Sequence, residues 1–231
     1  MIHATISGDI IAYTSLSDAD KIIIENEIVN LFKLLKKKFN VYGRMIKGDY
    51  LECYIPNPAD SLRVALIIKS YVKSFSLESS DSNNRVNAYK TYILRMAIGI
   101  GDISRFEPRK GIIDGEAIYF SGRIIEDNKS TSDKKRIVIK KTLFFKSKDE
   151  EINNTIDPLI GLIEVLLSKA TAKHNKVLFL KLMGNNEDTI AKKLNIYQST
   201  VNEHSTSLGW NAIEKAVYFY EKLITSKYSI V

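Results

Sequence analysis

The chain is poor in the residues that build covalent or metal frameworks. Among its 231 residues there is one cysteine, and the three histidines stand far apart. A disulfide within one chain is therefore excluded, and His3, His174 and His204 are too scattered to predict a metal cluster. No run approaches the roughly 18 apolar residues of a membrane span, and no basic leader precedes the first apolar segment. We expect a cytoplasmic protein with no membrane partner.

The composition is that of a globular protein with a basic charge balance. Hydrophobic residues make up 45% and charged residues 26% of the chain, which suits one medium domain and one small domain. Cys53 alternates with Leu51 and Ile55, so we interpret it as a core thiol rather than a nucleophile. The formal net charge of +7 permits a polyanionic partner such as DNA, but a lysine-rich composition alone also produces such a charge.

Apolar periodicity in the first part of the chain predicts alternating strands and helices. Strands are expected over 2–6, 42–55 (a hairpin turning at 47–49), 92–100 and 136–140, and helices over 17–38, 62–75 and 116–127. Ser17 is the expected N-cap of the first helix, whose apolar face is formed by Ile24, Ile28, Leu31, Leu34 and Leu35. The order β-α-β-β-α-β predicts an α+β, ferredoxin-like sheet, antiparallel in part and covered by helices on one face.

The second part of the chain is expected to be all-helical. A basic stretch over 129–148 and an amide-rich stretch over 149–154 come between the two parts, so we place a boundary near residue 155. This gives a mixed domain over 1–150 and a helical domain over 156–231. Helices are predicted over 159–169, 173–182, 187–194, 198–208 and 210–224, and Pro158 suits the start of the first of them.

Two aspartates follow apolar strand patterns in similar contexts. Asp9 lies in Ile6-Ser7-Gly8-Asp9-Ile10, and Asp49 lies in the hairpin segment Ile46-Lys47-Gly48-Asp49. If these strands are neighbours, both carboxylates meet at one edge of the sheet, where they repel each other and attract a hard divalent cation. The alternative is that Asp9 caps the turn into the helix and Asp49 belongs to a β-turn.

Four segments, taken in order, resemble the class III nucleotidyl cyclases and more closely the cyclase-like domain of the SatD family. They are Gly8-Asp9-Ile10-Ile11-Ala12-Tyr13-Thr14, Lys47-Gly48-Asp49, the strand over 94–103 and the segment from Asp114-Gly115 to Arg123. The resemblance covers about residues 1–140 and implies Mg²⁺ or Mn²⁺ at Asp9, Ile10 and Asp49. It also implies that Arg123 stabilises charge on a phosphate and that two chains form a homodimer to complete each site.

The resemblance is incomplete at the positions that would meet a nucleotide, which are Met45, Lys47, Ile112 and Tyr119. The purine-reading positions fall on Met45 and Ile112, and Tyr119 stands where the cyclases have an asparagine. Apolar side chains cannot read a purine edge by hydrogen bonds. These departures favour a degenerate sensory or dimerisation domain, and Arg123 is catalytic only if the domain is active. The alternative for Arg123 is an ordinary solvated helix residue.

The helical part contains a pattern typical of a helix-turn-helix. Ile190, Ala191, Leu194 and Val201 are spaced to face a core, and the small Ala191 permits a close helix crossing. The pattern resembles the helix-turn-helix of SatD proteins and other bacterial regulators, except that Tyr197 replaces the usual serine cap. The side chains expected to face DNA are Gln198, Ser199, Thr200, Asn202, His204 and Ser205. A plain helical hairpin with a polar outer face is the alternative.

Two functions therefore remain open from the sequence. The first is a bacterial DNA-binding transcription regulator whose cyclase-like domain binds a nucleotide or mediates dimerisation. The second is an active class III-like nucleotidyl cyclase that uses two metal ions and is regulated by its helical domain. Asp9, Asp49 and Arg123 favour the enzyme, whereas the residues at the nucleotide positions favour the regulator.

Overall fold

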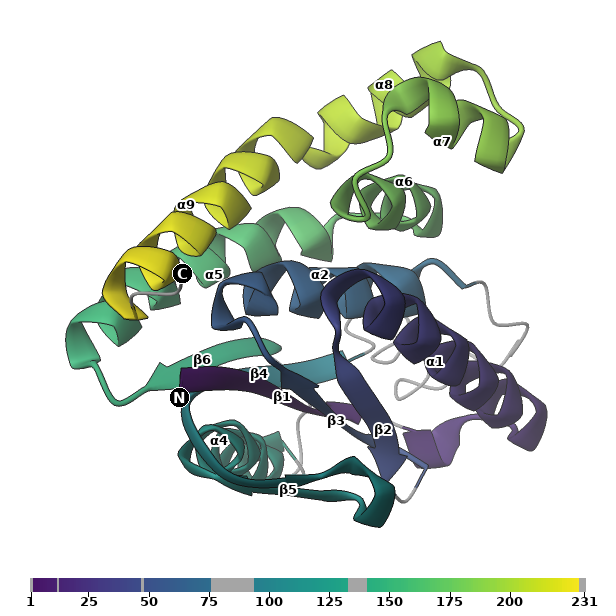
Figure 1. Ribbon diagram of the computed structural model, residues 1–231. Helices are drawn as coiled ribbons and strands as arrows, with labels where there is room; N and C mark the ends of the chain where they lie inside the picture. The colour runs from purple at the N-terminus through teal and green to yellow at the C-terminus, as the bar shows by residue number, and fades with distance from the viewer. Residues whose placement is uncertain (1, 12, 47, 76–93, 133–140, 229–231) are drawn as a thin grey trace.

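The computed structural model describes residues 2–11, 13–46, 48–75, 94–132 and 141–228 (Figure 1). The mixed part contains β1 (Ile2–Ile10), α1 (Asp18–Phe39), β2 (Tyr42–Ile46), β3 (Tyr50–Ile55), α2 (Ser61–Lys73), β4 (Leu94–Glu107), β5 (Ile112–Gly115), α4 (Glu116–Ser132) and β6 (Leu143–Ser147). Three short 3-10 helices are η1 (Tyr13–Ser15), η2 (Pro58–Asp60) and η3 (Pro108–Lys110). The predicted β-α-β-β-α-β order is confirmed.

The strands form one mixed sheet in which β1 is central. Its order is β2-β3-β1-β4-β5, and β6 also pairs with β4. The contacts of β1 with β3 and β4 are antiparallel, whereas β6 runs parallel to β4. The strand predicted over 136–140 lies outside the described residues. β6 falls in the basic stretch over 129–148, where no strand was predicted, because lysines surround the alternation of buried Leu143 and Phe145.

Helices cover both faces of the sheet, which corrects the prediction of one covered face. α1 and α2 lie on one side and α4 on the other (Figure 1). On the α4 side, the hydroxyls of Thr5 and Ser7 lie 2.9 and 2.8 Å from the hydroxyl of Ser121. A Cβ added at Gly99 would come within 2.1 Å of the Ala117 carbonyl oxygen. Glycine at this position of β4 therefore permits the direct approach of α4.

The first helix and the hairpin form largely as their sequences predict. The Ser17 side chain accepts a hydrogen bond from the Asp20 amide and caps α1. Gly48 takes a φ of 79° in the hairpin turn, a left-handed conformation that favours glycine. Leu34 was predicted on the buried face of α1 but is 42% exposed, because it lies about 100° around the helix from the buried Leu35. Cys53 is fully buried as predicted, and burial raises the pKa of its thiol.

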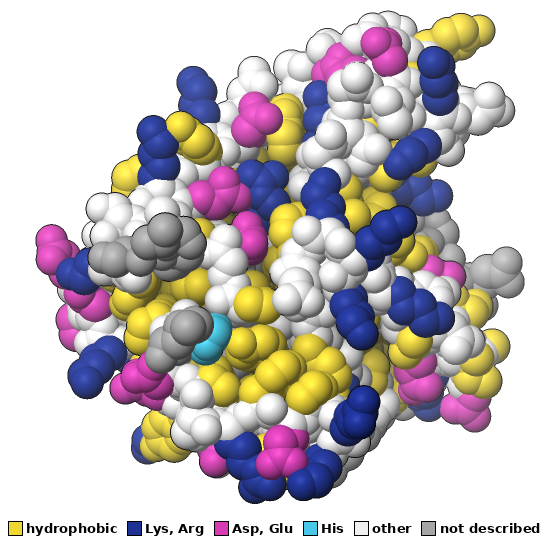
Figure 2. All heavy atoms as spheres, in the orientation of Figure 1, with side chains coloured by type: hydrophobic (Ala, Val, Ile, Leu, Met, Phe, Trp, Pro, Cys, Tyr) yellow, Lys and Arg dark blue, Asp and Glu magenta, His cyan; other side chains and the backbone are white. Residues whose placement is uncertain are grey.

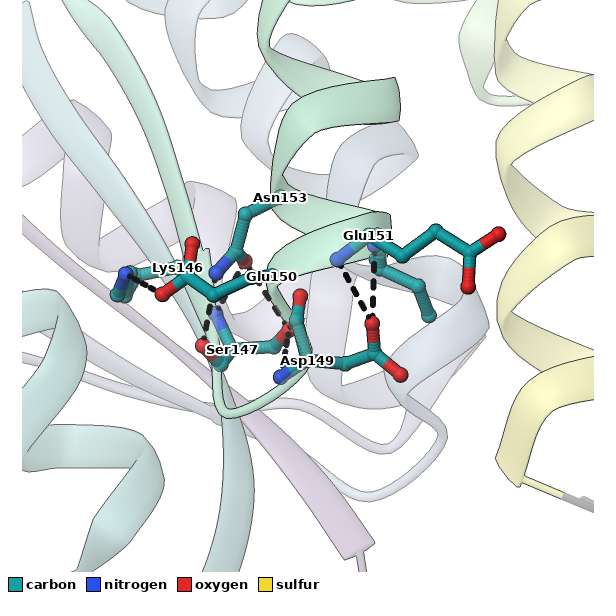
Figure 3. A network of polar contacts seen from close by, with 7 residues as sticks. Lys146, Ser147, Asp149, Glu150, Glu151 and Asn153 are labelled. Carbon is teal, nitrogen blue, oxygen red and sulfur yellow. Dashed lines mark hydrogen bonds and ion pairs between the residues drawn. The ribbon is translucent and has the colours of Figure 1, made fainter.

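The helical part begins earlier than predicted. Its helices are α5 (Glu150–Ser168), α6 (Ala172–Leu182), α7 (Glu187–Leu194), α8 (Gln198–Leu208) and α9 (Trp210–Tyr228). The predicted helix start at Pro158 is wrong, since Pro158 lies inside α5. The Asp149 carboxylate accepts hydrogen bonds from the amides of Glu151 and Ile152 and caps the helix instead (Figure 3). Asn153 then fixes α5 against β6 through hydrogen bonds to Ser147.

One buried cluster continues from the sheet into the helical part. The apolar faces of α5 and α9, including Ile160, Ile213 and Tyr220, belong to the same cluster as the strands and α1 and α2. The boundary predicted near residue 155 falls inside α5. The Tyr220 hydroxyl lies 2.6 Å from the hydroxyl of Ser61 at the start of α2. Within the described ranges, no helix combines the length and apolar character needed to cross a membrane.

Candidate functional site

The end of β1 and the β2–β3 turn lie side by side. The Ile10 amide donates to the Asp49 carbonyl oxygen at 2.8 Å, and Asp9 is opposite Tyr50 in the register of β1 and β3. The predicted adjacency of the two strand segments is therefore present in the backbone. Asp49 also lies near Tyr13, whose pKa is raised by burial, by the Glu25 carboxylate that its hydroxyl contacts, and by the charge of Asp49.

An arginine from β4 faces Asp9, which the sequence prediction did not anticipate. Arg95 is opposite Asp9 in the register of β1 and β4. Its Nε lies 3.9 Å from an Asp9 carboxylate oxygen, and the two side chains are only 7% and 9% exposed. This pair places a positive charge beside a buried carboxylate. A lone arginine inside the apolar strand Leu94-Arg95-Met96-Ala97-Ile98 was the sequence signal for it.

The residues at this edge fit a metal site only in part. The Asp9 and Asp49 carboxylates and the Ile10 carbonyl are oxygen donors of the kind that Mg²⁺ or Mn²⁺ prefers. However, Arg95 already provides a counter-charge for Asp9, and among the described residues no group of three or more His, Cys, Asp or Glu side chains could hold a metal ion. Since Mg²⁺ is typically held by one or two carboxylates together with water and substrate phosphates, these protein oxygens could hold an ion only with such additional ligands.

The described nucleotide positions lie on three different elements, with Met45 on β2, Ile112 on β5 and Tyr119 on α4. Met45 is opposite Leu51 and packs against the main buried cluster. Its neighbour Arg44 points to the other face of β2, where its guanidinium contacts the Gly111 carbonyl beside Ile112. Tyr119 is 57% exposed on α4, and Lys47 lies outside the described residues. Ile10, predicted as a metal ligand, has a side chain in the core with 2% exposure.

Arg123 lies on the outer side of α4. It is exposed, donates a hydrogen bond to the Tyr119 hydroxyl and lies 5.4 Å from the centre of the Tyr119 ring. Ser121, two residues earlier, faces β1, and two residues correspond to about 200° of rotation around a helix. Arg123 therefore points away from the side of α4 that packs on β1.

Helices α6, α7 and α8 form a second, smaller packed unit. Val177, Ile190, Ala191 and Val201 make a separate buried cluster, with Leu180, Leu194 and Ile196 packed at its edge. Asn195, at a φ of 52°, ends α7 and turns the chain toward α8. Tyr197 is the N-cap residue of α8. Its side chain is 83% exposed and, within the described residues, makes no capping hydrogen bond to the first turn of α8.

The outer face of α8 carries most, but not all, of the predicted contact residues. Gln198, Ser199 and Asn202 are exposed, and Thr200 and His204 are partly exposed. Ser205 is 4% exposed, so the prediction that it faces outward is wrong. It lies one turn after the buried Val201, to whose carbonyl its hydroxyl donates at 2.9 Å.

A carboxylate at the start of α7 binds the first turns of α8. Glu187 accepts from Gln198 at 2.5 Å and forms an ion pair with Lys181 at 2.8 Å. Lys181 most strongly lowers the pKa of the Glu187 carboxyl, and hydrogen bonds from Gln198 and Asn202 lower it further. Two predicted base-reading side chains are thus held in place by one acidic residue, which sequence spacing alone did not reveal.

Two of the three histidines meet between α6 and α8. The rings of His174 and His204 lie 5.1 Å apart, centre to centre. The His174 Nδ1 accepts a hydrogen bond from the Thr171 amide at 3.2 Å as part of the α6 cap. Its Nε2 lies 3.2 Å from the Ser207 hydroxyl. Burial and the neighbouring His204 lower the pKa of His174.

Comparisons with known proteins give only distant structural similarities. No protein-family model matches the chain, and no curated protein matches it. A dimeric guanylyl cyclase domain of a fusion protein from the aquatic fungus Blastocladiella emersonii is 16% identical, with a TM-score of 0.40, over 54% of this chain and 73% of that one. A bacterial light-regulated adenylyl cyclase is 13% identical, with a TM-score of 0.42, over 62% of this chain and 74% of that one. Similarities of this size do not identify a function.

Proposed function

We propose that this protein is a DNA-binding regulator that reads duplex DNA with α8. The observation that carries the proposal is the three-helix unit with a small buried cluster of its own, in which α7 and α8 are joined by a tight turn. α8 has 11 residues and is therefore about 16 Å long, which fits the major groove. Gln198 and Asn202 present amide groups of the kind that bond base edges.

The mixed part is proposed to bind a nucleotide or to join two chains. Paired helix-turn-helix units gain affinity from two half-sites, and a homodimer supplies them. The outward direction of Arg123 supports a role toward a second chain, in which it would approach the Asp9 and Asp49 edge of the partner. Light scattering at tens of micromolar should give a dimeric mass, and a monomeric mass would count against this arrangement.

Selection of DNA from a random or genomic pool with the purified protein tests DNA recognition. We expect an enriched sequence, and Gln198→Ala or Asn202→Ala should each weaken binding to it by about 1–3 kcal/mol, because each removes contacts to one base. Replacing Lys192 should instead weaken binding to all sequences alike. If no sequence is enriched, or if both amide variants bind the enriched duplex as well as the parent does, the helices have another role.

A second candidate function is nucleotidyl cyclase activity. It is favoured by the adjacency of the Asp9 and Asp49 segments through the Ile10 to Asp49 hydrogen bond. Incubation with each of the four nucleoside triphosphates and Mn²⁺, followed by detection of cyclic product and pyrophosphate, tests it. Product that disappears in Asp49→Asn would establish the enzyme. Binding of a triphosphate without turnover would assign the domain a sensory role.

A further inference from the structure

The C-terminal end of α1 carries a run of exposed lysines beside the proposed DNA-reading unit. Lys36, Lys37 and Lys38 occupy the last turn of this helix and are all exposed. The helix dipole favours cations at this end, which accounts for their presence at a helix C-terminus. It does not account for where this end lies in the fold.

The α1 end touches the turn that leads into α7. The Lys38 ammonium donates to the Met183 carbonyl oxygen at the end of α6. Gly184 follows in a left-handed conformation with a φ of 79°, and a Cβ there would lie 3.1 Å from the same ammonium. The end of α1 thus contacts the α6–α7 turn through a lysine.

A lysine of α7 contacts the same turn. The Lys193 ammonium donates to the Asn185 side-chain oxygen at 2.8 Å, and Lys192 beside it is exposed. In Figure 2, lysine and arginine side chains gather on the right-hand part of the face shown, from the upper helices down toward α1. The α6–α7 turn is therefore flanked by basic residues from two distant parts of the sequence.

Among the described residues, the acidic side chains near this turn are fewer than the basic ones. Glu187 and Asp188 lie in the first turn of α7, but Glu187 is paired with Lys181 at 2.8 Å. The positive groups that contact the turn are the ammonium groups of Lys38 and Lys193, and Lys37 is exposed in the same last turn of α1 as Lys38. The net charge is positive, and ammonium groups on flexible stems suit phosphate oxygens rather than one shaped ligand.

We infer that Lys37, Lys38 and Lys193 form a phosphate-binding surface for the backbone of duplex DNA, next to the segment read by α8. This inference rests on the proposed DNA-binding function and extends the contact surface into the mixed part of the chain. Because phosphate contacts carry no sequence information, the surface contributes to affinity and salt dependence rather than to base choice. It also gives the nucleotide-binding or dimerisation part a direct contact with DNA.

The test is the salt dependence of binding to a mixed-sequence duplex of about 30 base pairs, which is roughly three helical turns. Each lost phosphate contact lowers the slope of log affinity against log salt by about 0.9 and lowers affinity about fivefold near 0.15 M salt. We expect this loss for Lys37→Gln and for Lys193→Gln, and about twice the loss in slope for the double variant. Lys37→Arg should retain the parental slope.

Lys222→Gln is the matched control, because it removes the same charge from an exposed position of α9, where the ammonium lies over the Tyr218 ring. A Lys37→Gln slope equal to that of Lys222→Gln would overturn the inference. If Gln198→Ala still weakens binding to the selected duplex in that case, the proposed function stands alone. If the unmodified protein binds neither the mixed-sequence duplex nor the selected duplex, both the inference and the proposed function fail. The DNA assignment would also be overturned if Lys37→Gln and Lys193→Gln weakened binding to duplex RNA alone, or to anionic vesicles alone.

Discussion

Replacing Tyr220 tests whether the helical part and the mixed part fold as one unit. Tyr220 lies on α9 and is fully buried, with its hydroxyl 2.6 Å from that of Ser61 and its ring 6.0 Å from the ring of Phe145 on β6. Burial raises the pKa of its hydroxyl, so it stays protonated and can donate. One side chain thus joins α9 to both α2 and the sheet.

The loss of stability expected for each Tyr220 variant follows from the atoms that the replacement removes. Tyr220→Ala leaves a large cavity, and aromatic-to-alanine changes in a core cost about 3–5 kcal/mol. For a chain of this size this lowers the midpoint of thermal unfolding by roughly 6–20 °C. Tyr220→Phe removes only the hydroxyl. The Ser61 hydroxyl still donates to the Pro58 carbonyl at 2.7 Å, so we expect a cost near the lower end of about 0.5–1.5 kcal/mol.

The chain contains a natural probe for each part. The single tryptophan, Trp210, begins α9, and the single cysteine, Cys53, is buried in β3. Tryptophan fluorescence follows the helical part, and reaction of the thiol with a colorimetric disulfide reagent follows the sheet, because only exposed thiolate reacts readily. With Tyr220→Ala both transitions should move to lower denaturant concentration together.

The control is Tyr218→Ala on the same helix, since Tyr218 is 56% exposed and its loss should change stability by no more than about 0.5 kcal/mol. The reasoning is refuted if Tyr220→Ala shifts the Trp210 transition while Cys53 keeps its parental protection. The boundary predicted near residue 155 would then separate two independently stable domains.

Three further predictions concern α4, the α6 cap and the α7–α8 contact. Gly99→Ala places a Cβ 2.1 Å from the Ala117 carbonyl oxygen and should destabilise the protein by about 1–3 kcal/mol in urea unfolding, as overpacking does. The pKa of His174 is lowered in the folded state, so the neutral ring contributes fully to the free energy of unfolding above the unfolded pKa of about 6.5. This contribution is lost as the pH falls below that value. Urea midpoints at several pH values should show the loss, and His174→Gln should reduce it. Glu187→Gln removes a negative charge beside Gln198, so affinity for mixed-sequence DNA should rise and the preference for the selected duplex should shrink, as measured by competition binding.

Elements with strong local signals could be predicted from the sequence. The Ser17 cap followed by an apolar stripe defines α1, and the glycine between alternating runs defines the β2–β3 turn. Helices α7 and α8 could also be predicted, because Ile190, Ala191 and Val201 follow helical spacing around a short break. In each case the deciding interactions lie within a few residues along the chain.

Two errors in the predicted elements came from local signals that were present but misjudged. Asp149 followed by Glu150 and Glu151 is a helix-start pattern, and it outweighs the start signal at Pro158, which the helix accommodates in its interior. Ser205 follows Val201 by one turn and therefore shares its buried face. A polar side chain on an otherwise polar helix does not by itself indicate exposure.

The charge balance at the Asp9 edge could not be predicted, because it depends on strand register. The sequence predicts that Asp9 and Asp49 form a pair of like charges, which a nearby cation would stabilise. The register of β1 against β4 brings Arg95 to Asp9, and a shift of one residue would turn that guanidinium to the opposite face of the sheet. The carboxylates of a motif can therefore be read from the sequence, but whether a metal ion or a side chain balances them is decided by a strand far along the chain.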